Sequence, residues 1–479
     1  MQGKKSHQEK LFITFQLSDH IPTDNFYRRL SGLIDLSFLY PLTAPYYGAE
    51  GQKSIDPVVF MKLMLVGYLE NLNSDRRIIT TARLRLDILY FIGYDIDEEL
   101  PWHSTLSRTR HLYGEHVFTE LFKRVLKQCI DLGMISGRRQ AVDGFFIKAN
   151  ASLDSMIEKE ILEDAATYRQ ELKANEDQDT PAEAKYDDKG LKLKKNPSND
   201  THYSPSDPDA KMSVKPGKPT ALNYLGQIGV DTATHMITHI QAFKADKRDS
   251  ECLSAVLRHM KNNLLENGIA LQELIADTGY SSADALKSLQ ASGVTGYIPN
   301  RGQFKYERLG FTYHVTEDYY QCDQGTKVPY QGTYLTAGYW MKQYSTGGKN
   351  CNGCPVKNNC AAYKTKSNRV AIKETIDKPY YDQMHERMQT PKAKRMMKLR
   401  QSTVEPVIGT LVNFLGIKRV NTKGLSQANK CATMAAIAYN LKKMIKYKAK
   451  PLQNRPLKLC EYLNAIIIRP SYQLEIPIH

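Results

Sequence analysis

Three carboxylates stand out in this sequence, each in a short string of its own. Two short strings, residues 140–142 and residues 274–276, read as strands that stop on Asp143 and Asp277, and each aspartate is close to a glycine. Glu405 directly precedes a proline, which predicts that it lies in the first turn of a helix. Two aspartates at strand ends and one glutamate on a helix can hold two divalent metal ions against a phosphodiester. The pattern therefore indicates metal-dependent phosphodiester chemistry.

Magnesium is the ion that this donor set favours, because it prefers oxygen ligands and keeps some of its waters. Mn²⁺ is expected to substitute for it. In a two-ion site, one ion helps to deprotonate the attacking hydroxyl or water and the other stabilises the departing 3′ oxygen. Each string is weak evidence alone. An Asp close to a Gly is usually a turn residue, and a Glu early in a helix usually serves the helix dipole.

The elements between these carboxylates must bring them together. After the strand that stops at Asp143, apolar runs predict strands over 222–230, 236–240, 271–276 and 297–298, with helices over 249–264 and 281–289. The order strand, strand, strand, helix, strand, helix, strand predicts a ribonuclease H-like α/β core, a mixed sheet with helices. If the strands that carry Asp143 and Asp277 are neighbours, both carboxylates leave the sheet at one edge, and Glu405 approaches from a helix packed across it.

The composition divides the chain into five parts. An all-α N-terminal DNA-binding domain, with a helix that begins at Asp56 and Pro57, comes first. The catalytic core is expected in two pieces, separated by a small insertion and followed by a tail. The predicted boundaries are 1–138 for the helical domain, 139–299 for the first piece of the core (with a flexible charged excursion over 158–219), 300–377 for the insertion rich in Tyr and Cys, 378–447 for the helical piece that carries Glu405, and 448–479 for the tail. Helices in the last piece are predicted over 379–400, 405–415 and 426–443.

The charge of the chain indicates a polyanionic partner. The 479 residues carry a formal net charge of +15 and a pI near 9.2, which favours nucleic acid. A basic soluble enzyme without such a partner is the alternative. Two groups of basic residues are candidates for contact with DNA phosphates, one on a helix near residue 108 and one leading into the helix of Glu405. They are Arg108, Arg110, Lys392, Lys394, Arg395, Lys398 and Arg400. Each group could equally be a solvated helix face.

No apolar run reaches the length of ~18 residues that a membrane span needs. The N-terminus is polar and lacks the apolar segment of a signal peptide. We therefore expect a cytoplasmic protein without a membrane partner.

Four of the eight cysteines fall inside the insertion. Four thiolates can form a closed tetrahedral site for structural zinc, although reduced thiols and an iron–sulfur cluster are alternatives. The four are Cys322, Cys351, Cys354 and Cys360. The insertion is also rich in tyrosine, and its aromatic side chains could stack on exposed DNA bases or form the core of a β-rich insert.

Several longer motifs agree in order and spacing with one protein family. They are the strings at 54–57, 142–144 with 149–152, 206–210, 276–280, 404–409 and 438–441. From about residue 10 to 445, the chain resembles bacterial insertion-sequence transposases of the DDE type, in the group with an N-terminal helical transposase domain and a C-terminal DDE domain. The resemblance implies that Asp143, Asp277 and Glu405 are the metal ligands.

The resemblance also implies an activity and partners. These are the binding of the ends of an insertion sequence, strand cleavage and transfer to target DNA, a homodimer or larger assembly, and association with the nucleoid. Related transposases often place an Arg four residues before the Glu and a Lys seven after it. Here Gln401 and Val412 occupy those positions, and Arg400 and Lys418 lie nearby. Two other functions fit the residues: a metal-dependent nuclease without strand transfer, and a non-catalytic zinc- and DNA-binding regulator.

Overall fold

The structure is a computed structural model that describes residues 15–48, 50, 54–159, 197–214, 219–302, 304–336 and 338–447. Most of the predicted excursion over 158–219 and all of the predicted tail over 448–479 lie outside the described residues. No helix within the described ranges is both long and apolar enough to cross a bilayer.

The N-terminal part is helical, as the sequence predicts. Asp56 caps α4 by accepting hydrogen bonds from the backbone N–H groups of Val58 (2.7 Å) and Val59 (3.2 Å), and Pro57 occupies the first helical position. The amphipathic helix α8 buries one face, including Val117, Leu121 and Val125. The helices are α1 (Leu17–His20), α2 (Phe26–Ser31), α3 (Leu39–Thr43), α4 (Pro57–Leu69), α5 (Asp75–Leu84), α6 (Leu86–Ile92), α7 (His103–Leu112) and α8 (Glu115–Asp131).

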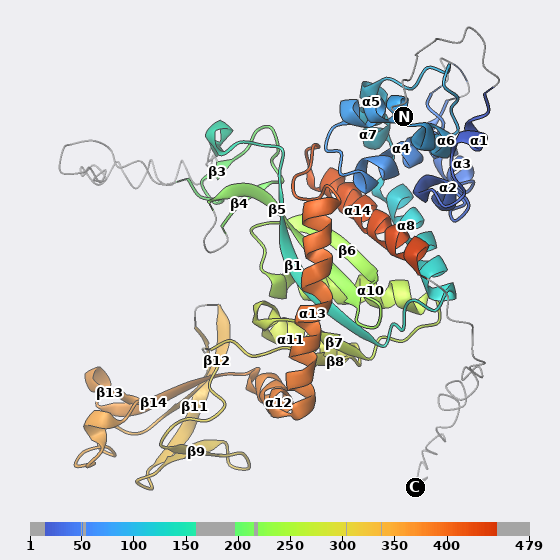
Figure 1. Ribbon diagram of the computed structural model, residues 1–479. Coiled ribbons are helices and arrows are strands. Elements are labelled where there is room, and N and C mark those ends of the chain that lie inside the picture. The colour runs from blue at the N-terminus through green and yellow to red at the C-terminus, as the bar shows by residue number, and fades with distance from the viewer. Residues whose placement is uncertain are drawn as a thin grey trace, which may run out of the picture. The chain divides into compact units, whose positions relative to one another are not determined.

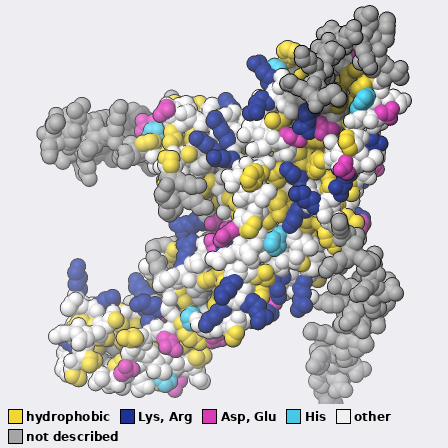
Figure 2. Space-filling model, viewed as in Figure 1, with side chains coloured by type: hydrophobic (Ala, Val, Ile, Leu, Met, Phe, Trp, Pro, Cys, Tyr) yellow, Lys and Arg dark blue, Asp and Glu magenta, His cyan; other side chains and the backbone are white. Residues whose placement is uncertain are grey.

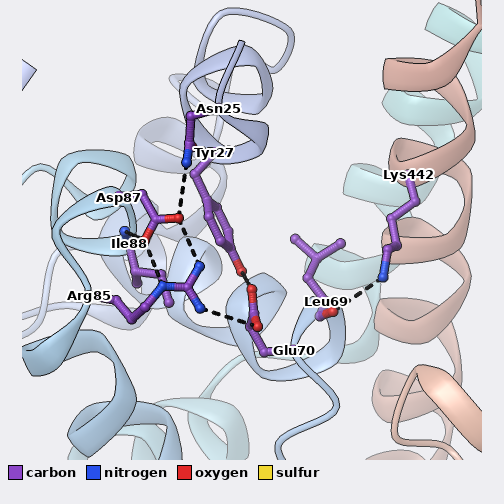
Figure 3. A network of polar contacts seen from close by, with 8 residues as sticks. All are labelled: Asn25, Tyr27, Leu69, Glu70, Arg85, Asp87, Ile88 and Lys442. Carbon is purple, nitrogen blue, oxygen red and sulfur yellow. Dashed lines mark hydrogen bonds and ion pairs between the residues drawn. The ribbon is translucent and has the colours of Figure 1, made fainter. Parts of the chain in front are cut away.

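A polar network joins α2, the end of α4 and the start of α6 (Figure 3). The Tyr27 hydroxyl donates to the Glu70 carboxylate at 2.7 Å, and Arg85 lies between Glu70 and Asp87, at 3.5 and 2.8 Å. Asn25 donates to Asp87 at 3.2 Å. Each charged group in this network has an opposite charge or a hydrogen-bond partner, as partly buried charges require.

A six-stranded sheet lies in the next part of the chain. Its strands are β1 (Arg139–Lys148), β4 (Lys211–Ser213), β5 (Ala221–Asp231), β6 (Ile237–Lys244), β7 (Glu273–Ile275) and β8 (Thr295–Tyr297). The order is β4-β5-β1-β7-β8, and β6 also pairs with β5. β1 pairs antiparallel with β5 and parallel with β7, so the sheet is mixed and β1 lies at its centre. The predicted strands and helices are observed in the predicted order, but the short strand β4 is an addition, because it lies in the segment 158–219, for which the sequence predicts a flexible excursion.

Helices cover both faces of this sheet (Figure 1). The helix α10 (Asp249–Leu265) packs on the face to which Gly144 and Gly229 turn, because a Cβ on either glycine would meet Asp249 or Met260 of α10. The long helix α13 (Pro391–Phe414) contacts Asp143 on the opposite face. Successive residues of a strand face opposite sides of a sheet, so Asp143 faces α13 while Gly144 faces α10. The helix α11 (Ala283–Ala291) precedes β8, and α12 (Lys378–Gln389) precedes α13.

The helix α14 (Leu425–Lys446) closes the edge of the sheet at β6. The side-chain amide of Asn440 donates to the carbonyl of Ile237 (2.9 Å) and accepts from its N–H (3.0 Å), and Asn429 makes the same pair of bonds to Ala242. Two asparagines thereby satisfy backbone groups that an edge strand leaves open. The same helix reaches the N-terminal helices through Lys442, which donates to the carbonyl of Leu69 at 3.4 Å.

A second sheet occupies the predicted insertion. Its strands are β9 (Phe311–His314), β10 (Tyr319–Cys322), β11 (Lys327–Thr336), β12 (Tyr339–Ser345), β13 (Tyr363–Lys364) and β14 (Arg369–Thr375), in the order β13-β14-β12-β11-β10-β9. Tyr320, Val328, Tyr344 and Ile372 belong to its buried core. The alternative in which the aromatic side chains form their own core holds for these tyrosines.

The helical prediction around Glu405 is wrong in its boundaries. The break lies at Thr390, whose hydroxyl caps α13 by accepting from the N–H of Ala393 at 3.2 Å, with Pro391 at the first helical position. The helix then continues through Pro406, which the sequence analysis takes as the start of a new helix. Pro406 leaves the carbonyl of Ser402 without its helical donor, and both residues are exposed, so water can satisfy that carbonyl.

Candidate active site

Asp143 lies in the middle of β1 and not at its end, since the strand continues to Lys148. The prediction of a strand that stops at this aspartate is wrong, because Gly144 continues the ladder opposite Gln227 of β5. One carboxylate oxygen of Asp143 accepts from the N–H of Gly144 at 2.8 Å. Burial raises the pKa of Asp143 to about 6, the positive charge of Arg400 opposes that rise, and the charge of Asp277 adds to it.

Asp277 follows the end of β7, as predicted. β7 is the parallel neighbour of β1, with Ala141 opposite Ile275, so the two aspartates come from adjacent strands. The Asp277 carboxylate accepts from the N–H of Gly279 at 2.9 Å and caps a short 3₁₀ turn (Thr278–Tyr280). The side chain of Asp277 is 42% exposed, whereas that of Asp143 is 17% exposed. The site therefore opens to solvent on the Asp277 side.

Arg400 of α13 joins the two aspartates. Its guanidinium nitrogen Nη2 lies 2.9 Å from Oδ2 of Asp143 and 3.6 Å from Oδ2 of Asp277. The side chain of Arg400 is only 8% exposed, and its Nε has no hydrogen-bond partner among the described residues. The expectation that Arg400 belongs to an exposed, DNA-facing basic run therefore differs from what is observed. Arg400 is an internal partner of the carboxylates.

Glu405 lies further along the same helix and is exposed. Five residues of α-helix advance by about 7.5 Å and turn by about 140°, so Glu405 and Arg400 cannot face the same point. The Glu405 carboxylate makes no hydrogen bond or ion pair with any other described residue. The structure thus brings Asp143 and Asp277 together and places Glu405 on the helix that crosses them, without contact. Within the described ranges, no three His, Cys, Asp or Glu side chains are arranged to hold a metal ion.

Asp249, which the sequence analysis does not select, is a further carboxylate beside the pair. A Cβ on Gly144 would lie 2.2 Å from Oδ1 of Asp249, and a Cβ on Gly279 would lie 3.2 Å from its Oδ2 and 3.0 Å from Oδ1 of Asp277. Gln227 donates to Asp249 at 2.6 Å and accepts from the Tyr280 hydroxyl. Asp249 gives no signal of its own in the sequence, because an Asp in the first turn of a helix is common. The available signal is the pair of glycines close to the motif aspartates, Gly144 and Gly279, which leave space for the Asp249 side chain.

The remaining basic candidates fall into different settings. Lys394, Arg395 and Lys398 are exposed on α13 and form no ion pair with the described residues. Lys392 is also exposed but pairs with Glu273 of β7, which anchors the start of α13 to the sheet. Figure 2 shows lysine and arginine side chains spread over this view of the surface, with few acidic side chains between them.

On α7, Arg108 is exposed and Arg110 is not. Arg110 is 2% exposed and pairs with Asp75 of α5 at 2.5 Å. A DNA phosphate could reach it only if this buried pair were broken, which is strongly destabilising. The two predictions for Arg110, a phosphate contact and a solvated residue, are therefore both wrong. Arg110 instead joins α7 to α5.

The cysteines of the second sheet do not form the predicted zinc site in this arrangement. Cys351 is buried in the apolar core of that sheet, where its sulfur lies 3.7 Å from the Thr346 hydroxyl, and Cys360 packs against the same core. Cys322 and Cys354 are partly exposed free thiols. A tetrahedral site needs four thiolates that converge on one point. Among the described residues these cysteines form no group that could hold a metal ion as they lie, so zinc and reduced thiols both stay predictions.

Two family models match separate parts of the chain. Residues 15–112 match a family described as a transposase domain (DUF772), and residues 321–445, which contain Arg400 and Glu405, match a family described as a transposase DDE domain. No curated protein matches the chain.

Among solved structures, the piggyBac transposase synaptic complex with hairpin DNA is similar at 8% identity over 95% of this chain and 86% of that chain, with a TM-score of 0.30. A pre-cleavage Mos1 transpososome is similar at 8% identity over 52% of this chain and 60% of that chain, with a TM-score of 0.16. The two matches lie in the order that the motifs predict, so the chain carries a match to a transposase domain followed by a match to a transposase DDE domain.

Proposed function

We propose that this protein is a DNA transposase whose ribonuclease H-like core cleaves the ends of its insertion sequence and transfers them to target DNA. The observation that carries the proposal is the pairing of Asp143 and Asp277 on adjacent parallel strands around one cationic group. In chain order, the antiparallel strands β1, β5 and β6 are followed by the parallel strands β7 and β8, with the short strand β4 added beside β5, and this order supports the ribonuclease H-like description.

The donor set fits a divalent metal site. Asp143 and Asp277 already share a positive group, and Glu405 has an exposed carboxylate with no partner among the described residues. We assign these three as the residues that would hold Mg²⁺ or Mn²⁺. Two such ions, when bound, polarise the scissile phosphate and activate the attacking oxygen. A third carboxylate from α13 also requires that helix to adjust, because Glu405 does not contact the aspartates.

The protein's own residues would then position DNA. Lys394, Arg395 and Lys398 form an exposed cationic row on α13, the helix that carries Glu405, and we assign them to phosphate contacts. Arg108 is the remaining exposed candidate on the N-terminal helices, which we expect to distinguish the element's ends. A homodimer or larger assembly would allow two ends to be processed together.

The proposal is tested with a supercoiled plasmid that carries the sequences flanking the gene. Wild-type protein should nick at the element's ends with Mg²⁺ or Mn²⁺ and not with EDTA. Asp143→Asn, Asp277→Asn and Glu405→Gln should each lower the cleavage rate by at least about 100-fold. The matched control is Glu120→Gln, which removes an exposed carboxylate on α8 that pairs with Arg124 and should leave the rate unchanged. Cleavage by any of the three site variants at the control rate would remove that residue from the assignment.

A further inference from the structure

Arg400 lies in the position that a metal ion between Asp143 and Asp277 would need. A single guanidinium nitrogen is within 2.9 Å of one carboxylate and 3.6 Å of the other. Two carboxylates this close repel one another unless a cation lies between them. In the metal-free site, the guanidinium therefore balances the negative charge of the two carboxylates, as a bound divalent cation would. The guanidinium and the cation cannot occupy the same space.

The other end of the guanidinium shows that this pairing is incomplete. The Nε of Arg400 is buried and has no hydrogen-bond partner among the described residues. A buried donor without a partner is unfavourable, and an arginine commonly satisfies Nε together with Nη2 by binding two oxygens of one anion. A DNA phosphate presents two such oxygens, whereas the pairs to Asp143 and Asp277 use only Nη2.

The position of Arg400 on α13 connects this pairing to Glu405. Both side chains belong to one continuous helix, and they face different directions around it. While Arg400 is held between the aspartates, the helix stays in the register in which Glu405 lies exposed and apart from them. The release of Arg400 would remove one of the contacts that hold α13 on the sheet, while the ion pair of Lys392 with Glu273 remains.

We propose that Arg400 is an exchangeable counter-cation of the active site: it occupies the carboxylates until divalent metal displaces it, and its freed guanidinium then binds a phosphate of the DNA. This inference rests on the proposed function, because it requires Asp143 and Asp277 to bind metal. Arg400 is then a positioning residue with two alternating partners, the aspartate pair and a DNA phosphate. Without DNA, metal binding is weak because the metal must displace a guanidinium that has no other partner among the described residues.

The test measures Mn²⁺ binding to the purified full-length chain by isothermal titration calorimetry, without DNA. Arg400→Gln and Arg400→Met remove the charge while keeping part of the side chain's volume, and both should bind Mn²⁺ about tenfold more tightly than wild type. Arg400→Lys keeps the charge and should bind like wild type or only slightly more tightly. The control Arg395→Gln removes an exposed arginine of the same helix and corrects for the change in net charge. Circular dichroism identifies any variant that does not fold.

The phosphate step is tested by repeating the titration with a short DNA duplex. DNA should strengthen Mn²⁺ binding more in wild type than in Arg400→Gln, because only wild type has a guanidinium for the phosphate to remove. Equal Mn²⁺ affinity of wild type and both neutral variants, with binding still lost in Asp143→Asn, would overturn the exchange alone. Mn²⁺ binding that survives in both Asp143→Asn and Asp277→Asn would instead overturn the metal site of the proposed function.

Discussion

The guanidinium of Arg400 on α13 lies 2.9 Å from the carboxylate of Asp143 on β1, on the face of the central sheet opposite α10. This contact joins the helix that carries Glu405 to the strand that carries the first motif aspartate. The Asp143 carboxylate is buried and paired with Arg400, whereas the Glu405 carboxylate on the same helix is exposed. Different substitutions in this one site should therefore have different effects on stability.

Glu405→Gln should abolish cleavage without weakening the fold. The carboxylate is exposed and has no partner among the described residues, so its loss should change the free energy of unfolding by no more than about 0.5 kcal/mol. Urea denaturation followed by circular dichroism measures this. A loss of several kcal/mol would mean that Glu405 has a structural role that the present arrangement does not show.

Gly144→Ala should destabilise the catalytic domain, by roughly 2 kcal/mol or more, because the added Cβ would lie 2.2 Å from Oδ1 of Asp249. The matched control is Gly409→Ala on α13, where nothing lies within 4 Å of the new Cβ. An alanine there should stabilise the helix by about 0.5 to 1 kcal/mol. If both substitutions shift the urea midpoint in the same direction, the close approach of Asp249 to β1 is not as described.

Glu273→Gln should lower stability at neutral pH but not in acid. Arg139 and Lys392 both bond to the Glu273 carboxylate, and these bonds hold its pKa below the usual value. A lowered folded-state pKa means that the unfolded chain binds the proton first as the pH falls, so this stabilisation is complete above about pH 4.5 and is lost below it. The expected difference from wild type is roughly 1 to 2 kcal/mol at pH 7, and it should shrink as the pH falls through the lowered folded-state pKa of Glu273. A difference that does not change with pH would show that the carboxylate's charge is not involved.

Neutralising Lys394, Arg395 and Lys398 together should weaken DNA binding on all sequences alike. Each lysine or arginine on a phosphate releases counterions, so the slope of log affinity against log salt should become shallower by about 2 to 3 units. Fluorescence anisotropy over a salt series measures the slope. Neutralising Lys123, Arg124 and Lys127 on α8 gives a variant with the same charge change away from α13. A slope that changes equally in both variants would place the DNA elsewhere.

The sequence predicted five of the six strands of the central sheet, because these strands contain apolar runs and the helices between them are amphipathic. It missed β4, whose three residues Lys211–Ser213 form no apolar run. It misplaced the helix boundary near Glu405, because Pro406 was taken as a helix start although a proline on an exposed face can lie inside a helix. Contacts between residues that lie far apart in the sequence could not be predicted from it. Nothing local distinguishes Arg110 from Arg108, yet Asp75 draws only Arg110 into the core. Asp249 likewise becomes part of the site only through the sheet's register.

The most direct measurement of the central claim is a strand-transfer assay. A duplex that ends in the element's own terminal sequence with a free 3′ hydroxyl is incubated with a target plasmid, the protein and Mg²⁺, and joined products are counted by sequencing. The account predicts covalent joining of the 3′ end to the target by wild type and by Glu120→Gln, and none by Asp277→Asn. Cleavage of the plasmid without any joined product would contradict the account and identify a nuclease that shares the same carboxylates.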